Sequence, residues 1–425
     1  MNKCLFVIFK ILELFSSLLV IIVFFIPLII VSLFSRFFEF KGNGIFIGIH
    51  EIANNIENIQ NAFDSKGFQT NSIIEPNKFY TSGKLKSQLN KSTRICLVLP
   101  GNIILRNFYK LYKKFLLPIL LFYQIYRNRT WIFVWNKTFL PLNLDLIILR
   151  LSGKKIIMFH CGDDVRYRPM QAHINNVLNI DILKNCEMYP NFLKNFWFVW
   201  ISEKTADQIL SCRDQSTFQQ VPYNHFKFPM MALDPVQCRK NSTVKIVHAP
   251  SDRSVKGTEV VLKVINNLSK NNINFEFVLL ENKSNEFVLK ELQTADILID
   301  QPGVWVARLA LEGCASRCAV IGGNNPSYVG MSDSPIIQFE RTPESLYSVL
   351  FELINDSTLL NEKKNACYQF WYKNYSYESF FNYFNQVVEN KAQKFLPLFN
   401  QKKYLLESSE NWFQWFIVKI FYNPL

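Results

Sequence analysis

The segment His248-Ala249-Pro250-Ser251-Asp252-Arg253-Ser254-Val255-Lys256-Gly257-Thr258 decides the fold of this chain. It follows an apolar strand predicted at Val244–Ala249 and leads into a helix predicted from Gly257 to about Lys270. N–H groups at a helix start attract anions, Arg253 and Lys256 add two cations, and Gly257 lets the backbone approach a ligand closely. The segment therefore fits a bound diphosphate. An ordinary basic turn between a strand and a helix is the alternative.

After this segment the chain continues as an alternation of strands and helices. Short apolar runs bounded by turn residues predict strands, and apolar residues at helical spacing predict helices. The predicted strands are Phe275–Leu280, Asp296–Asp300 and Cys318–Ile321, and the predicted helices are Asn285–Thr294 and one that ends near Arg317. Such alternation forms a parallel sheet with helices on both faces. We therefore predict a doubly wound α/β domain over residues 244–395, in which 343–395 are helical and rich in aromatic residues.

The part of the chain before residue 220 repeats this pattern. Apolar residues at helical spacing follow the strand Ile45–Ile49, and Gly67 ends that helix. The alternation of strands and helical segments continues at Arg94–Gly101, Trp131–Val134, Lys155–Phe159 and Phe196–Ile201. A second doubly wound domain is therefore expected over residues 41–220. Residues 221–243 contain three prolines and little periodicity, which predicts a linker.

A second group of polar residues follows the predicted strand Asp296–Asp300. Asp300 and Gln301 begin a turn that contains Gly303, and Glu312 lies among small and apolar residues on the next helix. A carboxylate in such a place can accept two hydrogen bonds from the neighbouring hydroxyls of a ribose. A salt bridge from Glu312 to Arg308, four residues earlier on the same helix face, is the alternative.

The segments HAPSDRSVKGT, ADILIDQPG and LALEGCASRCAVIGG, in this order, resemble the donor domain of family-4-like GT-B glycosyltransferases. The similarity covers about residues 244–390, and 44–220 more faintly. It implies two Rossmann-like domains that face a cleft and transfer a sugar from a nucleotide-sugar without a metal or other cofactor. It also implies that Arg253 and Lys256 bind the donor diphosphate and that Glu312 contacts the ribose.

The chain departs from that family's pattern at the donor sugar. The family has a first Glu eight residues before the second, and Val304 occupies that place here. Arg317 and Ala319 stand where Gly and Pro are common. Asp300 and Gln301 are close enough in sequence to take over part of the role of the missing Glu.

In the first domain, His160-Cys161-Gly162-Asp163-Asp164-Val165-Arg166 follows a predicted strand. It resembles an H-x-G-x-D-x-R-like stretch of some polysaccharide-assembly transferases. His160 or Asp163 could then act as an acid–base group, although a lone His after a strand is more often a structural hydrogen bonder. Gly48 and His50 lie at the first strand–helix turn, and we expect them to line the acceptor side because ligands bind beyond the carboxyl ends of parallel strands.

The first 40 residues are expected to form a membrane anchor. Leu14–Ser35 carries no charged residue, and a bilayer core needs roughly 20 apolar residues as a helix. A cleaved signal peptide is the alternative, but the run is too long and no small-residue cleavage site follows it. Basic residues lie on both sides of the run, so charge alone does not set its orientation.

Two further segments suggest contact with a membrane. The stretch 115–123 is too short to span a bilayer but is flanked by cations within Arg106–Arg129, which fits either monotopic binding or a buried core helix. The tail, residues 396–425, includes the apolar run Trp412–Tyr422. We expect this run to cross back onto the first domain, and a membrane interface is the alternative.

Composition limits the possible partners. A net charge of +13 suits an anionic partner, and the chain has no zinc-finger spacing, RNP-like segment or long basic run that would favour nucleic acid. The nine scattered cysteines predict reduced thiols and hence a cytoplasmic body. Cys314 and Cys318 have the spacing of half a metal site, but no second half matches them, so no metal is expected.

These features together predict an enzyme, a hexosyltransferase-like glycosyltransferase attached to a membrane. We expect it to move a sugar from a nucleotide-sugar to a lipid-linked or polysaccharide acceptor at the cytoplasmic membrane face. Two alternatives remain at the level of the sequence. One is a GT-B-fold epimerase that acts on the nucleotide-sugar itself, and the other is a non-catalytic glycan-assembly protein that retains the fold.

Overall fold

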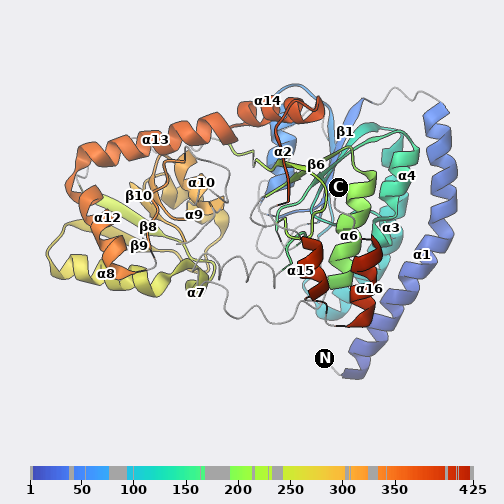
Figure 1. Ribbon diagram of the computed structural model, residues 1–425, viewed down its shortest axis with the longest axis horizontal. Coiled ribbons are helices and arrows are strands. Elements are labelled where there is room, and N and C mark those ends of the chain that lie inside the picture. Colours follow the sequence, from blue (N-terminus) through green and yellow to red (C-terminus); the bar gives the residue numbers. More distant parts are fainter. Residues whose placement is uncertain are drawn as a thin grey trace. The chain divides into compact units, whose positions relative to one another are not determined.

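The computed structural model describes residues 3–37, 43–52, 54–75, 93–98, 100–162, 164–167, 192–212, 216–227, 229–231, 243–301, 306, 308–323, 334–340, 342–397, 401–407, 409 and 411–421. The chain divides into two compact units (Figure 1). Unit 1 comprises the described residues within 1–167, 189–226 and 385–425, and unit 2 those within 227–384.

Unit 1 is built on a sheet whose described strands have the order β12-β7-β6-β5-β4-β1-β2-β3. The strands are β1 (Gly44–His50), β2 (Thr70–Glu75), β3 (Thr93–Cys96), β4 (Asn128–Val134), β5 (Lys155–Phe159), β6 (Gln208–Ser211), β7 (Tyr223–His225) and β12 (Lys394–Phe395). All neighbours are parallel except β12, which pairs antiparallel with β7. The β1–β2 register places His50 beside Glu75 at the carboxyl ends of both strands.

Unit 1 also contains helices, some of which pack on other helices and not on the sheet. They are α1 (Lys3–Phe37), α2 (Asn55–Asp64), α3 (Ile103–Ile125), the short η1 (Pro141–Asn143), α4 (Asp145–Leu151), α6 (Phe192–Thr205), α15 (Gln401–Glu407) and α16 (Trp412–Phe421). The core contains Phe46, Trp131 and Phe133, all fully buried and in ring contact. α1 packs along α3 and α4 (Figure 1).

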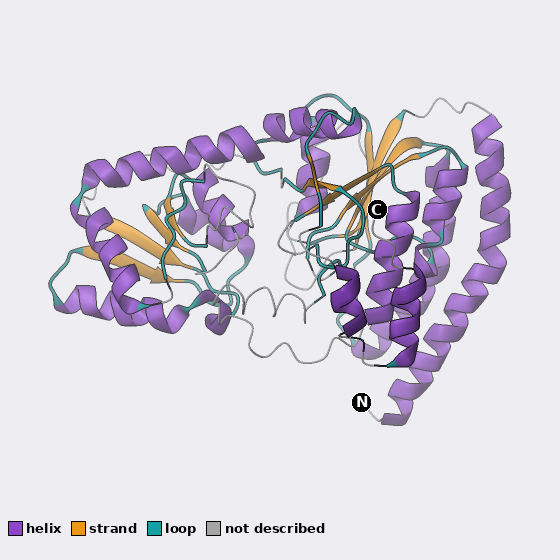
Figure 2. Ribbon diagram, in the orientation of Figure 1, coloured by secondary structure: helices purple, strands orange, loops and turns teal. Residues whose placement is uncertain are grey.

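Unit 2 has a parallel sheet of the order β11-β10-β8-β9. Its strands are β8 (Val244–His248), β9 (Phe275–Leu279), β10 (Ile297–Ile299) and β11 (Ala319–Ile321). Its helices are α7 (Arg253–Lys256), α8 (Thr258–Lys270), α9 (Asn285–Leu292), α10 (Arg308–Ala315), α12 (Pro343–Asn355) and α13 (Ser357–Tyr375) (Figure 2). α14 (Tyr377–Val388) starts in unit 2 and ends among the residues of unit 1. Two apolar clusters, built around Leu298 and Ile299, fill the two faces of this sheet.

The predicted α/β architecture of two parallel-sheet units is confirmed. Phe196–Ile201 is helical and belongs to α6, because a short apolar run has no periodicity that separates a strand from a buried helix. Tyr223–His225, inside the segment predicted as linker, forms β7. In the tail, the Phe421 ring lies 5.7 Å from that of Trp200 on α6, within unit 1.

Candidate functional site

Lys256 and Asp300 meet at the carboxyl ends of the unit 2 strands. Lys256 ends α7, just after the turn that follows β8, and Asp300 directly follows β10. Lys256 Nζ lies 2.5 Å from Asp300 Oδ1, and the two side chains are 9% and 1% exposed. Asp300 Oδ2 is buried and has no hydrogen-bond partner in the part of the chain that the structure describes. Because buried carboxylate oxygens normally accept a hydrogen bond, this unpartnered atom marks a candidate contact for a ligand donor.

The turn that carries Lys256 is fixed by His248 and Gly257. His248 Nδ1 lies 2.9 Å from the Ile299 carbonyl oxygen, and its Nε2 lies 3.0 Å from Thr258 Oγ1. Burial lowers the pKa of His248, so the ring is neutral, donates to the carbonyl and accepts from the hydroxyl. Gly257 has a φ of 65°, the left-handed region that favours glycine, and it separates α7 from α8.

Arg253 lies on the exposed side of the same turn. Its guanidinium contacts Glu259 at 2.8 Å and Glu281 at 2.9 Å, and these two carboxylates raise its pKa further. Exposed ion pairs of this kind contribute little to stability. A diphosphate could therefore compete with both carboxylates for Arg253.

Glu312 is buried on α10 and already has two partners. Arg308 Nε donates to its Oε1 at 2.9 Å, and Asn285 Nδ2 lies 3.4 Å from both carboxylate oxygens. The salt bridge that the sequence offered as an alternative to ribose binding is thus present. A Cβ on the adjacent Gly313 would lie 2.4 Å from Leu298 Cδ2, so α10 can pack this closely on β10 only with glycine there.

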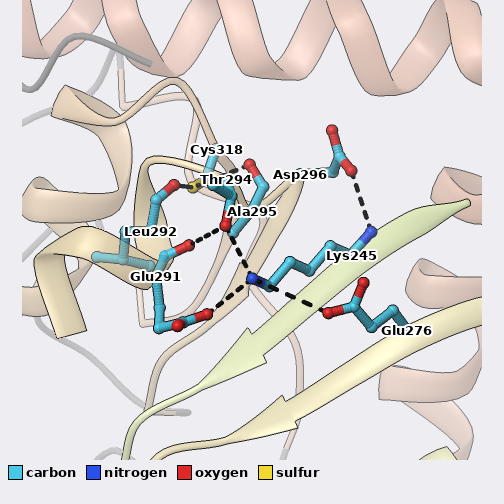
Figure 3. Close-up of polar contacts among 8 residues, drawn as sticks. All are labelled: Lys245, Glu276, Glu291, Leu292, Thr294, Ala295, Asp296 and Cys318. Atoms are coloured by element: carbon cyan, nitrogen blue, oxygen red, sulfur yellow. Dashed lines mark hydrogen bonds and ion pairs between the residues drawn. The ribbon is translucent and has the colours of Figure 1, made fainter. Parts of the chain in front are cut away.

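A different polar network occupies the amino ends of the same strands (Figure 3). Lys245 Nζ contacts Glu291 at 2.7 Å and Thr294 Oγ1 at 2.8 Å, while its backbone N–H donates to Asp296 at 3.0 Å. The Cys318 thiol donates to two carbonyl oxygens at 3.5 and 3.6 Å. Burial raises the pKa of Cys318, which keeps the thiol protonated. These contacts tie β8 to the α9–β10 connection.

In unit 1, His50 ends β1 beside a cluster of charges. Glu75 contacts Lys137 Nζ at 2.5 Å and Lys113 Nζ, which comes from α3. Burial alone would raise the pKa of Glu75, but Lys137 and Lys113 lower it to about 2. Burial, followed by Lys137, lowers the pKa of His50 to about 4, so its ring is neutral at pH 7. Its Nδ1 is buried and has no hydrogen-bond partner among the residues described.

The sequence identified His50 but not the charges beside it. Lys113 lies 38 residues from Glu75 and Lys137 lies further along, so only the β1–β2 register and the packing of α3 bring them together. Gly48 lies inside β1, where a Cβ would come within 2.9 Å of the Phe46 ring and the Ile73 carbonyl oxygen. Glycine at this position therefore allows β1 to pack closely against its neighbours.

His160 follows β5 and is fully buried. Its Nδ1 lies 3.0 Å from Asp164 Oδ2, while Asp164 Oδ1 accepts from the backbone N–H groups of Cys161 and Gly162. Asp164 therefore orients the ring, a role that the sequence did not assign although the residue stands inside the quoted stretch. His160 Nε2 has no hydrogen-bond partner within the described ranges. If the Nδ1 proton is donated to Asp164, Nε2 is left as an acceptor.

The structure thus places the predicted residues in distinct groups. Lys256 and Asp300 are together, and Gln301 is buried beside them, where its carbonyl oxygen accepts from Gly323 N–H at 2.8 Å. Glu312 belongs to the Arg308 pair. Asp163, Gly303 and Val304 lie outside the described residues. Within the described ranges, no group of three or more His, Cys, Asp or Glu side chains could hold a metal ion.

No protein-family model matches the chain, and no curated protein matches it. Among solved structures, sucrose-phosphate synthase from Thermosynechococcus elongatus matches 82% of this chain and 98% of its own, with a TM-score of 0.51 and 11% identity. HepE of Anabaena in complex with UDP matches with 9% identity and a TM-score of 0.48, covering 82% of this chain and all of its own (100%). A glycosyltransferase from Rickettsia africae has the same coverage and TM-score, with 12% identity. The likeness to the synthase shows the fold, which is GT-B.

Proposed function

We propose that this protein is a glycosyltransferase that moves a sugar from a nucleotide-sugar to a lipid-linked or polysaccharide acceptor at the cytoplasmic face of a membrane. The observation that carries the proposal is the buried Lys256–Asp300 pair at the carboxyl ends of the unit 2 strands, in which Asp300 Oδ2 has no partner among the described residues. In open parallel sheets this edge is where ligands bind. The GT-B fold and the basic turn before α8 support a nucleotide-sugar as that ligand, with its diphosphate at the cations of the turn.

In this proposal, the position of each donor-site residue suggests its role. Lys256 binds the diphosphate as a point charge, and Arg253 adds a second cation when it exchanges its surface carboxylates for phosphate. Asp300 and Gln301 bind the donor sugar in place of the Glu that Val304 replaces. Glu312, oriented by Arg308, accepts hydrogen bonds from the ribose hydroxyls. The reaction needs no metal, so transfer continues in the presence of EDTA.

The acceptor binds at the carboxyl edge of the unit 1 sheet in this proposal. His50 is neutral at pH 7 and its buried Nδ1 has no partner among the described residues, so it can accept a hydrogen bond from an acceptor hydroxyl or donate one to it. The same chemistry is open to His160 Nε2, with Asp164 fixing the tautomer. Asp163 is the other acid–base candidate from the sequence.

Membrane attachment is supported by α1. Its stretch Ile11–Arg36 is 26 residues long and contains an 18-residue window with a mean hydropathy of 3.1, of which 17% is buried. This is long and apolar enough to cross a bilayer core by length and composition. An enzyme held at a membrane meets lipid-linked acceptors there, which is why we favour that acceptor class.

The direct test is an incubation of purified full-length protein with a panel of nucleotide-sugars and membrane lipid extract. We expect transfer of one sugar to the lipid fraction, or at least donor hydrolysis, together with nucleotide diphosphate binding measured by calorimetry. The double variant His50→Gln/His160→Gln should retain nucleotide binding and lose transfer. If no donor tested were transferred or hydrolysed and no nucleotide diphosphate bound, the proposal would be wrong.

A non-catalytic assembly protein is the second candidate, and one observation favours it. The charged groups of the donor edge are internally paired, with Arg308 on Glu312 and two carboxylates on Arg253. In that case nucleotide would bind weakly or not at all. Glu312→Ala would leave glycan assembly in the producing cell unchanged, whereas the enzyme proposal expects a loss.

A further inference from the structure

Helix α1 is held against unit 1 near both of its ends. Near the amino end, the Phe9 ring lies 5.7 Å from the Phe108 ring of α3. Closer to the middle of the helix, Lys114 Nζ donates to Ser17 Oγ at 2.6 Å. Near the carboxyl end, Ser32 Oγ donates to the Ile148 carbonyl oxygen of α4 at 3.0 Å. Specific hydrogen bonds at two distant points fix the helix along the body rather than leaving it as a free tail (Figure 1).

The two sides of α1 differ in polarity. The buried side includes three serines, at 16, 32 and 35, as well as Val20 and Leu28. The exposed side carries large apolar side chains along its length, among them Leu14, Leu18, Ile22, Ile26 and Ile30. In a transmembrane helix, polar side chains usually face neighbouring transmembrane helices. Here they face a unit built on a Rossmann-like sheet, and the apolar row is left outside.

The adjacent helix α3 has the same division. Its inner side carries Lys113, paired with Glu75 of the sheet, and the buried Leu117 and Leu121. Its outer side exposes eight large residues, among them Ile104, Phe108, Tyr112, Ile119 and Tyr123. Because α1 and α3 pack side by side, their outer sides extend one another. Large exposed apolar side chains on two adjacent helices indicate an interaction site.

A spanning orientation of α1 conflicts with its contacts. From Phe9 to Ser35 the helix measures about 39 Å at 1.5 Å per residue. A bilayer core is about 30 Å thick, so a spanning α1 would place its two ends on opposite sides of it. Both ends contact the same unit: Phe9 meets Phe108 of α3 and Ser32 meets Ile148 of α4, and these two residues of α1 are about 34 Å apart along the helix. Unit 1 would then have to sit in hydrocarbon with its loops, whose polar backbone has no partners there.

We infer that α1 lies in the plane of the membrane, embedded with α3 in one leaflet, so that both ends of α1 and the whole body are on the same side. The α1–α3 surface thus contacts one lipid leaflet. This inference rests on the membrane attachment in the proposed function and specifies its geometry. Charge supports this choice, because Arg36, Lys110 and Arg129 are exposed cations on or beside these helices and suit anionic headgroups. Tyr112 and Tyr123 have the amphipathic side chains that favour the headgroup level.

The topology of the full-length protein tests this. Cells producing the protein with one epitope before residue 1 and another after residue 425 are converted to inverted, cytoplasm-outside vesicles and treated with protease. In-plane docking predicts that both epitopes are digested in intact inverted vesicles and that both are protected in right-side-out vesicles. Protection of only the first epitope in inverted vesicles would show a spanning α1 and overturn the inference.

A matched pair of variants tests the surface itself. Ile26→Lys places a charge on the exposed side of α1, and Phe351→Lys makes a similar change on an exposed position of α12 in unit 2. With vesicles of phosphatidylcholine and phosphatidylglycerol, we expect Ile26→Lys to lower the bound fraction about tenfold, while Phe351→Lys binds like the unaltered protein. Equal binding by both variants would contradict the inference. It would also be contradicted if the unaltered protein formed a soluble dimer and did not bind the vesicles. Neither readout requires turnover, so a failed transferase assay does not affect them.

Discussion

The two ends of the unit 2 sheet use the same residue type in different ways. At the amino ends, Lys245 is surrounded by partners, and its ammonium group contacts both a carboxylate and a hydroxyl (Figure 3). At the carboxyl ends, Lys256 contacts Asp300, whose second oxygen has no partner among the described residues. Hydrogen-bonding capacity that is used up within the protein contributes to stability. Capacity that is left open at the ligand-binding edge can contribute to function.

Unit 1 extends this difference to a second sheet. His50 and His160 follow β1 and β5, and each has one buried ring nitrogen without a partner in the described part of the chain. Such atoms are not confined to strand ends, because Trp371 Nε1 within α13 is another. What distinguishes the two histidines is their position at the carboxyl edge of a parallel sheet, together with a ring that can donate or accept a proton.

The largest effect is expected from Lys245→Met. This change removes the buried cation that joins β8 to Glu291 and Thr294, and it leaves those groups without their partner. We expect the free energy of unfolding to fall by about 3 kcal/mol, as for the loss of one partner of a buried pair. Urea denaturation measures this. Nucleotide diphosphate binding by the folded variant should stay unchanged, and a selective loss of binding would contradict the division between the two edges.

Lys256→Ala should weaken nucleotide diphosphate binding by about 1.5–3 kcal/mol, the range for hydrogen bonds to charged groups. Calorimetry with a panel of nucleoside diphosphates measures the change. The variant also leaves the buried Asp300 carboxylate unpaired, and this alone could distort the site. The control is therefore the double variant Lys256→Ala/Asp300→Asn. If the double variant binds as tightly as Asp300→Asn alone, Lys256 has no direct role at the diphosphate.

Acidification should lower the stability of the protein because His50 is buried in its neutral form. Its pKa is about 4 in the folded protein and 6.5 in the unfolded chain, so between these values the unfolded chain binds the proton and the folded protein does not. Stability is therefore fully present above pH 6.5 and falls as the pH decreases towards 4. Between pH 7 and pH 5 we expect the titration of His50 to lower the free energy of unfolding by about 2 kcal/mol, at 1.36 kcal/mol per pKa unit.

The matching variant is His50→Gln, which cannot titrate in this range. Urea denaturation of both proteins at several pH values isolates the contribution of His50 from that of the other histidines. The stability of the variant should decrease less between pH 7 and pH 5 than that of the unaltered protein. Parallel pH profiles would mean that His50 is not desolvated as the structure indicates.

The sequence predicted those features that depend on local pattern. The apolar runs of β1, β5 and β8 and the turn around Gly257 were visible because burial and backbone conformation constrain residues close together in the chain. Pairings between distant segments could not be predicted. The contacts of Lys113 with Glu75 and of Ser32 with Ile148 arise from sheet register and helix packing, which a single sequence does not encode locally. The long apolar helix α1 was predicted from its composition, whereas the side on which it docks was not.

The smallest effect is expected from Arg253→Ala. Arg253 is exposed and is held by Glu259 and Glu281, so a diphosphate must displace these carboxylates before it gains the contact. We therefore expect the dissociation constant for a nucleoside diphosphate to rise only about two- to fivefold, as for an exposed ion pair. The double variant Glu259→Gln/Glu281→Gln frees the guanidinium and should tighten binding slightly, with a steeper salt dependence. A loss on Arg253→Ala as large as that on Lys256→Ala would show that the exposed side of the turn belongs fully to the site.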